Sequence, residues 1–80
     1  MQNFSIMAII LDNRSKNAPE VQEVLTKYGD GIISRLGIHD ADSNNGIISL
    51  NINKDDGFVR DLTNDLLQLE GVQVKTLKVK

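Results

Sequence analysis

Residues 28–38, which read YGDGIISRLGI, constrain the fold of this chain more than any other stretch. Gly29 has no side chain to clash in the left-handed conformation that often closes a helix. Asp30 and Gly31 favour a tight turn, and the residues from Ile32 onward have the β-branched and apolar density of a strand. The stretch therefore predicts a helix that ends at a corner and passes directly into a strand.

The rest of the chain repeats this order of strand, helix and strand. Apolar runs predict strands at residues 4–11, 32–38, 47–53 and 72–79, and the dipeptide Asn45-Gly46 is a hairpin signal. The first strand is apolar on both faces, as in a central strand. In the last strand the apolar residues change parity, which predicts a bulge or a change of face near Thr76.

Two segments have the apolar spacing of helices. We expect the first helix to begin at Asn17, which forms a capping box with Glu20 after a polar loop at residues 12–17. Asp55 or Asp56 caps the second helix, and Gly71 ends it. The apolar positions are Val21, Val24, Leu25 and Tyr28 in the first helix, and Val59, Leu62, Leu66 and Leu69 in the second.

The resulting order βαββαβ predicts an α+β fold of the ferredoxin-like type. This fold is a sandwich in which a four-stranded antiparallel sheet carries two helices on one face. No linker or low-complexity run interrupts the sequence, so we expect residues 1–80 to form a single domain.

The composition points to a small soluble protein that gains stability by self-association. A chain of 80 residues has a marginal core, and the lack of cysteine excludes disulfides, so we expect a homo-oligomer, most simply a dimer. The net charge of −2 gives no footprint for nucleic acid. The sequence has no apolar run long enough for a membrane span and no signal peptide, which predicts a cytoplasmic location.

The alternation of the strands predicts which residues form the dimer interface. A βαββαβ unit leaves one face of its sheet bare, and a soluble monomer rarely exposes a large apolar patch. We assign to the helix side the residues Ile6, Ala8, Ile10, Ile32, Leu36, Ile38, Ile48, Leu50 and Ile52. The opposite parity places on the bare face, as the interface, Met7, Ile9, Ile33, Ile47, Leu77 and Val79.

Four residues are candidates for binding a small molecule. Asn13, Arg14 and Ser15 precede the expected helix N-terminus, where free backbone N–H groups favour an anion. Arg35 lies inside a strand, where an arginine faces solvent, joins an ion pair or holds an anion at a subunit boundary. We therefore expect any ligand of this domain to contact these residues.

A metal site is a weaker alternative, and catalysis is not expected. His39 with Asp40 and Asp42 supplies metal-ligand side chains, but neither a cysteine nor a second histidine is present to complete a zinc-type site. The serines have no triad context, and the sequence lacks a phosphate-binding glycine loop. We therefore predict no cofactor and a non-enzymatic protein, with a metal-responsive sensor as the alternative function.

One set of residues and spacings is shared with a known family: Tyr28-Gly29-Asp30, Ile32, Arg35, Gly37, Ile38, Ile47-Ile48-Ser49, Leu69, Gly71-Val72 and Lys75-Thr76. Through these residues nearly the whole chain resembles the iron-only hydrogenase system regulator family, whose members have an ACT-like, ferredoxin-like fold. The resemblance implies a regulatory role in the expression or maturation of a hydrogenase. The fold is also similar to the effector domain of nickel-responsive repressors and to ACT domains, which bind amino acids at subunit interfaces. We expect a regulatory module that associates with itself and binds a small ligand between subunits.

Overall fold

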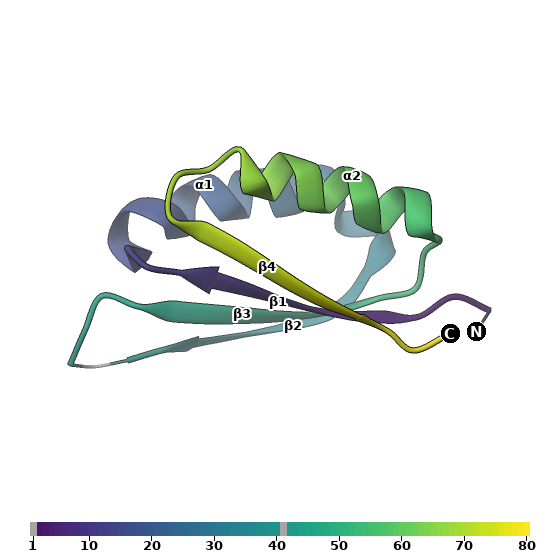
Figure 1. The fold of residues 1–80 in the computed structure, drawn as a ribbon, viewed down its shortest axis with the longest axis horizontal. Coiled ribbons are helices and arrows are strands. Elements are labelled where there is room, and N and C mark those ends of the chain that lie inside the picture. The colour runs from purple at the N-terminus through teal and green to yellow at the C-terminus, as the bar shows by residue number, and fades with distance from the viewer. Residues whose placement is uncertain (1, 41) are drawn as a thin grey trace.

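The computed structural model describes residues 2–40 and 42–80 and has the predicted βαββαβ order. The elements are β1 (Ser5–Leu11), α1 (Arg14–Lys27), a 3-10 turn (Gly29–Gly31), β2 (Ile32–His39), β3 (Gly46–Ile52), α2 (Asp56–Leu67) and β4 (Val72–Lys78). The strands form one antiparallel sheet in the order β2-β3-β1-β4, and both helices lie on the same face of it (Figure 1). The ferredoxin-like α+β fold is therefore confirmed.

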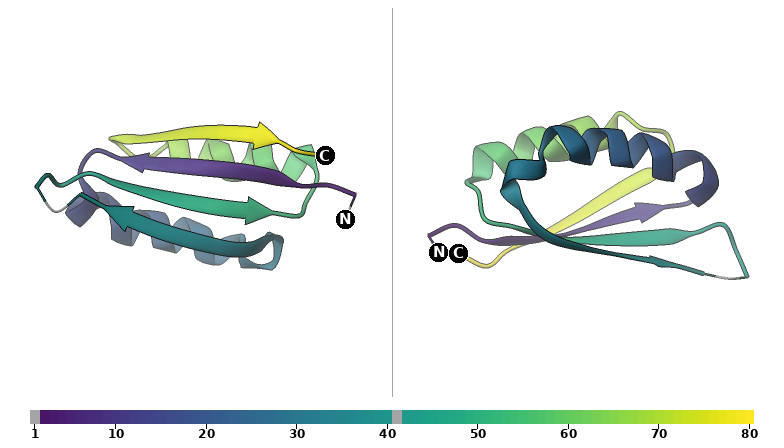
Figure 2. Two further views of the ribbon diagram at one scale, coloured as in Figure 1. Left: turned by 90° about the horizontal axis from the view of Figure 1, so that it is seen from below. Right: turned by 180° about the vertical axis from the view of Figure 1, so that it is seen from behind.

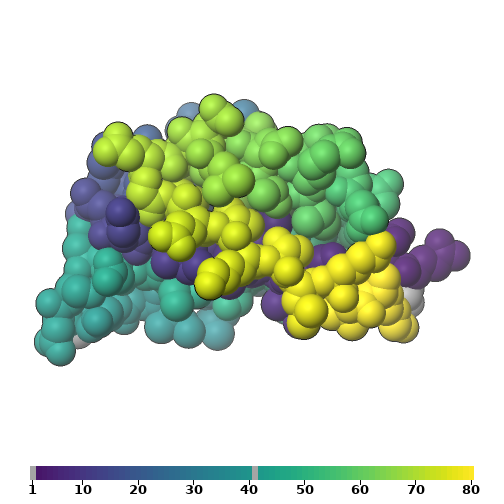
Figure 3. Space-filling model, in the orientation of Figure 1, coloured from purple at the N-terminus to yellow at the C-terminus, as the bar shows by residue number. Residues whose placement is uncertain are grey.

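The molecule is elongated along the strands, with a long axis of 39 Å. The β2–β3 hairpin extends beyond the helical layer at one end, where Figure 3 shows its teal tip standing clear of the helices. Within residues 2–40 and 42–80, no helix is long and apolar enough to cross a membrane.

The core lies between the two helices and the central strands. The predicted helix faces are confirmed, because Val21, Leu25, Leu62 and Leu66 are buried there. The remaining buried apolar residues are Met7, Ile9, Leu11, Val24, Ile48, Leu50, Ile52 and Val72.

The predicted face assignment of β1 is wrong. Met7 and Ile9 are both 0% exposed, because they pair with Leu50 and Ile48 on the side that the helices cover. They therefore do not lie on the bare face. Both parities of β1 are apolar, so the sequence pattern contains no signal for the correct face, and a shift of one residue exchanges the two sets. The bare face instead receives Ile6, Ala8 and Ile10 from this strand.

The assignments in the outer strands also need correction. A register shift between Ile32 and Ser34 places the bulge in β2, whereas β4 pairs with β1 without interruption from Val72 to Lys78. The expected bulge near Thr76 is therefore absent, and ordinary alternation places Val72 and Val74 on the helix side and Leu77 on the bare face.

Leu36 and Ile38 were predicted for the helix side, and this prediction is wrong. After the bulge in β2 they lie on the bare face, paired with Ser49 and Ile47. Ile33 lies at the bulge itself, without a pairing partner in β3, and lines a cavity with Leu25 and Thr26 of α1. The prediction is right for Ile47 and Leu77, which lie on the bare face.

The ends of the helices differ from the predictions in two places. Helix α1 begins at Arg14, so the expected capping box is wrong and Asn17 is a fully buried residue inside the helix. The Asn17 side chain accepts from the Asn13 N–H at 3.2 Å and donates to the Glu70 carbonyl at 2.8 Å. Gly29 does not adopt a left-handed conformation, whereas Gly71 does, with φ of 80°.

Candidate functional site

A groove of about 260 Å³ lies between α1 and the edge strand β2, above a floor that includes Leu11 and Ile48. Figure 2 shows α1 and β2 diverging toward the tip of the β2–β3 hairpin. One wall comes from successive turns of the helix and the other from alternate positions of the strand. The wall residues are Arg14, Ala18 and Gln22 on α1, and Arg35, Gly37 and His39 on β2.

The sheet register explains why the β2 wall faces the groove. Arg35 pairs with Leu50 and Gly37 pairs with Ile48, and both partners point toward the helical layer. Paired residues of an antiparallel sheet share a face, so the side chain of Arg35 points the same way. No described residue of β2 is buried, because the helices do not cover the outer edge of the sheet.

The two charged groups of the groove are hydrogen-bond donors only, because Arg14 and Arg35 carry guanidinium groups. His39 and Gln22 add an imidazole and an amide, which can donate and accept. None of the described lining residues is acidic. Neither arginine forms an ion pair in the part of the chain that the structure describes. The groove is therefore a concave, donor-rich and unneutralised surface.

Arg14 is the most constrained of these groups. Its backbone N–H donates to the Asn44 carbonyl at 2.6 Å, which attaches the start of α1 to the β2–β3 hairpin. Its stem passes over Gly46, where a Cβ would lie 3.1 Å from the Arg14 Cδ. The Arg14 Nε is buried and has no hydrogen-bond partner among residues 2–40 and 42–80. Such an unsatisfied donor is uncommon in a folded protein.

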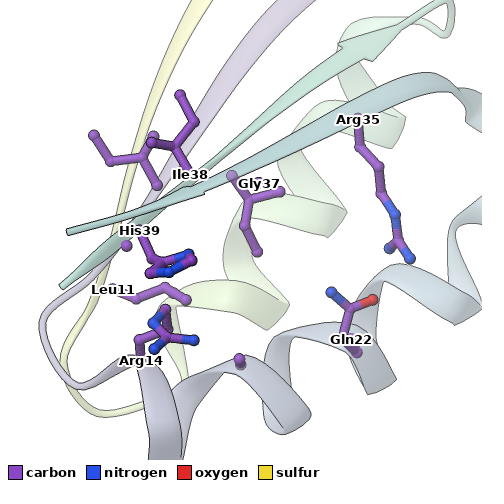
Figure 4. Close-up of a pocket in the computed structure, with 11 residues that line it drawn as sticks. Leu11, Arg14, Gln22, Arg35, Gly37, Ile38 and His39 are labelled. Carbon is purple, nitrogen blue, oxygen red and sulfur yellow. The ribbon is translucent and has the colours of Figure 1, made fainter. Parts of the chain in front are cut away.

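Figure 4 shows how the groove side chains are directed. Arg35 extends from β2 toward Gln22 on α1, and His39 lies over Arg14 at the other end of the groove. Gly37 separates Arg35 from His39 and has nothing within 4 Å of the position that a Cβ would occupy. The centre of the groove is therefore open between two donor groups at its ends.

The structure brings together two of the four residues predicted to contact a ligand. Arg14 and Arg35 line the same groove, although 20 intervening residues separate them in sequence. Asn13 and Ser15 lie outside it, and their side chains bond to the Asn44 amide. The Ser15 N–H also donates to the Asn44 Oδ1 at 3.2 Å, so part of the expected anion-binding helix terminus is already occupied.

The alternative metal site is not assembled from the described residues. His39 points into the groove, whereas Asp40 accepts from the Asp42 N–H at 2.9 Å within the hairpin turn. Among residues 2–40 and 42–80, no group of three or more His, Asp or Glu side chains is placed to hold a metal ion.

Sequence reasoning missed Gln22 and Gly37, and it considered His39 only as a metal ligand. Residue spacing could have found Gln22 and Gly37. Gln22 is eight residues from Arg14 on one helix face, and Gly37 is two residues from Arg35 on one strand face. The helix spacing could not be used because the expected helix began only at Asn17, which left Arg14 in a loop.

Comparisons with known proteins agree with this fold. A family model named TM1266-like, whose description proposes a regulator of the iron-only hydrogenase system, matches residues 3–76. A search of curated proteins finds no match.

Two solved structures are similar. The uncharacterized protein TM1266 from Thermotoga maritima has a TM-score of 0.89 and 32% identity, over 96% of each chain. A formyltetrahydrofolate deformylase from Pseudomonas putida KT2440 has a TM-score of 0.63 and 14% identity, over 91% of this chain and 28% of that one. The second likeness shows the fold alone. The length of the family match and the identity to the Thermotoga protein show that this chain belongs to the TM1266-like family of iron-only hydrogenase system regulators.

Proposed function

We propose that this protein is a non-enzymatic regulatory module of an iron-only hydrogenase system, which binds a small ligand in the α1–β2 groove and associates with a second copy of itself. The regulatory role is taken from the description of its family. Ligand binding and self-association are both inferred from the position of β2. This strand contributes Arg35 and Gly37 to the groove and Leu36 and Ile38 to the bare face.

The bare face of the sheet supports self-association through its composition. Leu36, Ile38 and Leu77 on this face are 63%, 58% and 64% exposed. Ile6 and Ile47 are a further 40% and 43% exposed. Of the described strand positions that point to this side, Lys75 alone is charged. Interface cores are depleted of charge in the same way.

A second copy of the chain is the partner that this face fits best. An apolar face with almost no charge offers no pattern that would select a charged partner, but it complements itself when two sheets stack face to face. A four-stranded face with strands about 4.8 Å apart and about 24 Å long covers roughly 450 Å² in projection. Stable interfaces bury about 800 Å² per partner, so we expect a dimer of moderate affinity.

The shared strand also gives the module a route for regulation. A ligand that orders Arg35 on one side of β2 changes the freedom of Leu36 and Ile38 on the other side. Any resulting coupling is reciprocal, because a ligand that favours the dimer must itself bind the dimer more tightly.

Sedimentation velocity tests the association. We expect the wild type to dimerise reversibly at tens of micromolar. A variant with Leu36→Lys and Leu77→Lys should be folded but monomeric, because it places a second and a third charge on the bare face of each copy. Leu67→Lys is the matched control, since Leu67 is 51% exposed on α2, away from this face. A monomeric wild type, or a double variant that still dimerises, would show that the bare face is not the interface.

A further inference from the structure

The α1–β2 groove has the chemistry of a receptor for a small organic anion. We infer that it binds a carboxylate or phosphate group attached to an uncharged, largely apolar body, and that it discriminates against amino acids. This inference rests on the proposed function, because it names the class of ligand for the same groove.

The charge of the groove favours an anion. Arg14 and Arg35 enter it from opposite walls, and no acidic side chain among the described lining residues neutralises them. Guanidinium groups are planar forks that match the oxygen atoms of carboxylates and phosphates. The Arg14 Nε has no partner in the described chain, so no acceptor of the protein holds this guanidinium group through its Nε.

The size of the groove and its apolar surface favour a small ligand with an apolar body. Its volume of about 260 Å³ exceeds the ~150 Å³ of a cavity that holds benzene and is slightly below the ~300 Å³ at which drug-sized pockets begin. Leu11 and Ile48 form an apolar floor, and Ala18 and Gly37 keep the walls low. The groove therefore fits an acid of a few carbon atoms whose apolar body lies on this floor.

The charge of the groove also gives it selectivity. An α-amino acid carries an ammonium group next to its carboxylate, and burial of that charge is costly unless an acceptor or a negative charge compensates it. The described lining residues provide no carboxylate for it; they offer a neutral acceptor in the Gln22 amide oxygen and place two arginines nearby. An acid without the amino group should therefore bind more tightly than the amino acid with the same carbon skeleton.

Calorimetric titration of the full chain with matched probes tests whether the groove binds an anion and whether it discriminates against amino acids. The probes are 4-methylpentanoate, leucine, which adds only the α-ammonium group, and 3-methylbutyl phosphate, which changes only the anionic head. We expect 4-methylpentanoate or 3-methylbutyl phosphate to bind, and whichever binds more tightly identifies the head group. Leucine should bind at least tenfold more weakly than 4-methylpentanoate. Failure of both anions to bind, or equal binding of leucine and 4-methylpentanoate, would overturn the inference.

Three variants locate the site. Arg35→Ala should weaken binding by about tenfold or more, as for the loss of a charged hydrogen-bond pair. Arg60→Ala should leave binding unchanged, because Arg60 lies on α2 with an exposed side chain beside Asp61. Gly37→Val leaves every charge in place but fills the centre of the groove, and it should abolish binding in a folded protein. Equal losses in Arg35→Ala and Arg60→Ala, or undiminished binding in Gly37→Val, would contradict the site.

The two proposals can fail separately. Binding of an anion as described, together with a monomeric wild type, would remove self-association and leave the anion site. Self-association through the bare face without binding of any anionic probe would remove the anion site and leave the interface.

Discussion

Tyr28 links the two helices through its hydroxyl group. The side chain closes α1 and donates to Asp65 Oδ2 on α2 at 2.6 Å, and its ring meets Phe58 edge to face with centroids 5.3 Å apart. The hydrogen bond to Asp65, with partial burial and the nearby negative charge, raises the pKa of Tyr28 to about 12. The phenol therefore holds its proton far more firmly in the folded chain than in the unfolded chain.

The titration of Tyr28 gives a residue-level prediction. The unfolded chain loses the phenolic proton near pH 10, whereas the folded chain keeps it to about pH 12. The protonated Tyr28 hydroxyl therefore contributes fully to the free energy of unfolding below pH 10. This contribution is lost as the pH rises from 10 to 12. Tyr28 is the one tyrosine of a chain without tryptophan, so tyrosinate absorbance reports on it directly.

The expected midpoint for the native protein is about pH 12. Asp65→Asn should lower it, because this change removes the negative charge that holds the phenolic proton. A native midpoint near 10, or an unchanged midpoint in Asp65→Asn, would rule out this hydrogen bond.

Single residues also show what the sequence could and could not predict. Arg14 and Arg35 could be chosen as candidate contacts because a charged side chain beside a helix start or within an apolar strand is unusual. Their shared groove was not, because it depends on the divergence of α1 from β2, which leaves no mark in local periodicity. Asn17 was misread because the same short amide that caps helices here bonds inside one, to Asn13 and to Glu70.

At the scale of elements, the connection from α2 to β4 depends on the conformation of Gly71. Its φ of 80° is unfavourable for other residues, and a Cβ there would overlap the Asp12 carboxylate. Gly29, at the end of α1, has an ordinary backbone and nothing within 4 Å of a Cβ. Two glycines in similar sequence positions therefore have different structural roles.

A pair of alanine variants tests this difference. Gly71→Ala should lower the free energy of unfolding by at least ~1 kcal/mol, from the left-handed conformation alone. For a domain of this size that corresponds to a melting temperature lower by about 4–8 °C. Gly29→Ala should be neutral or stabilising by up to ~1 kcal/mol, because it restricts the unfolded chain. Similar melting temperatures for the two variants would contradict the assigned backbone conformations.

The strands show the limit of pattern reading at this scale. Their existence and order were predictable, because β-branched runs and glycine-rich corners are local signals. The face of β1 was not, because Ile6, Ala8 and Ile10 are as apolar as Met7 and Ile9. The bulge at Ile33 shifted the parity of β2 by one residue, and its cause lies in pairing with β3 and not in the composition of β2.

At the scale of the whole molecule, the apolar character of both faces of the sheet has a single explanation. The helices cover one face, and we propose that a second copy covers the other. The predicted fold followed from the order of the elements and was confirmed. Of the residues predicted for the interface, Ile47 and Leu77 lie on the bare face, whereas Met7 and Ile9 lie in the core.

The central functional claim is that the α1–β2 groove is the ligand site, and backbone amide NMR during titration with 4-methylpentanoate tests it most directly. A second cavity, lined in part by Asp12, Asn44 and Gly71, opens elsewhere on the molecule and provides an internal comparison. We predict that the largest shifts occur at the amides of Arg35, Gly37 and His39. Shifts concentrated at Asp12, Asn44 and Gly71, with those β2 amides unmoved, would contradict the account.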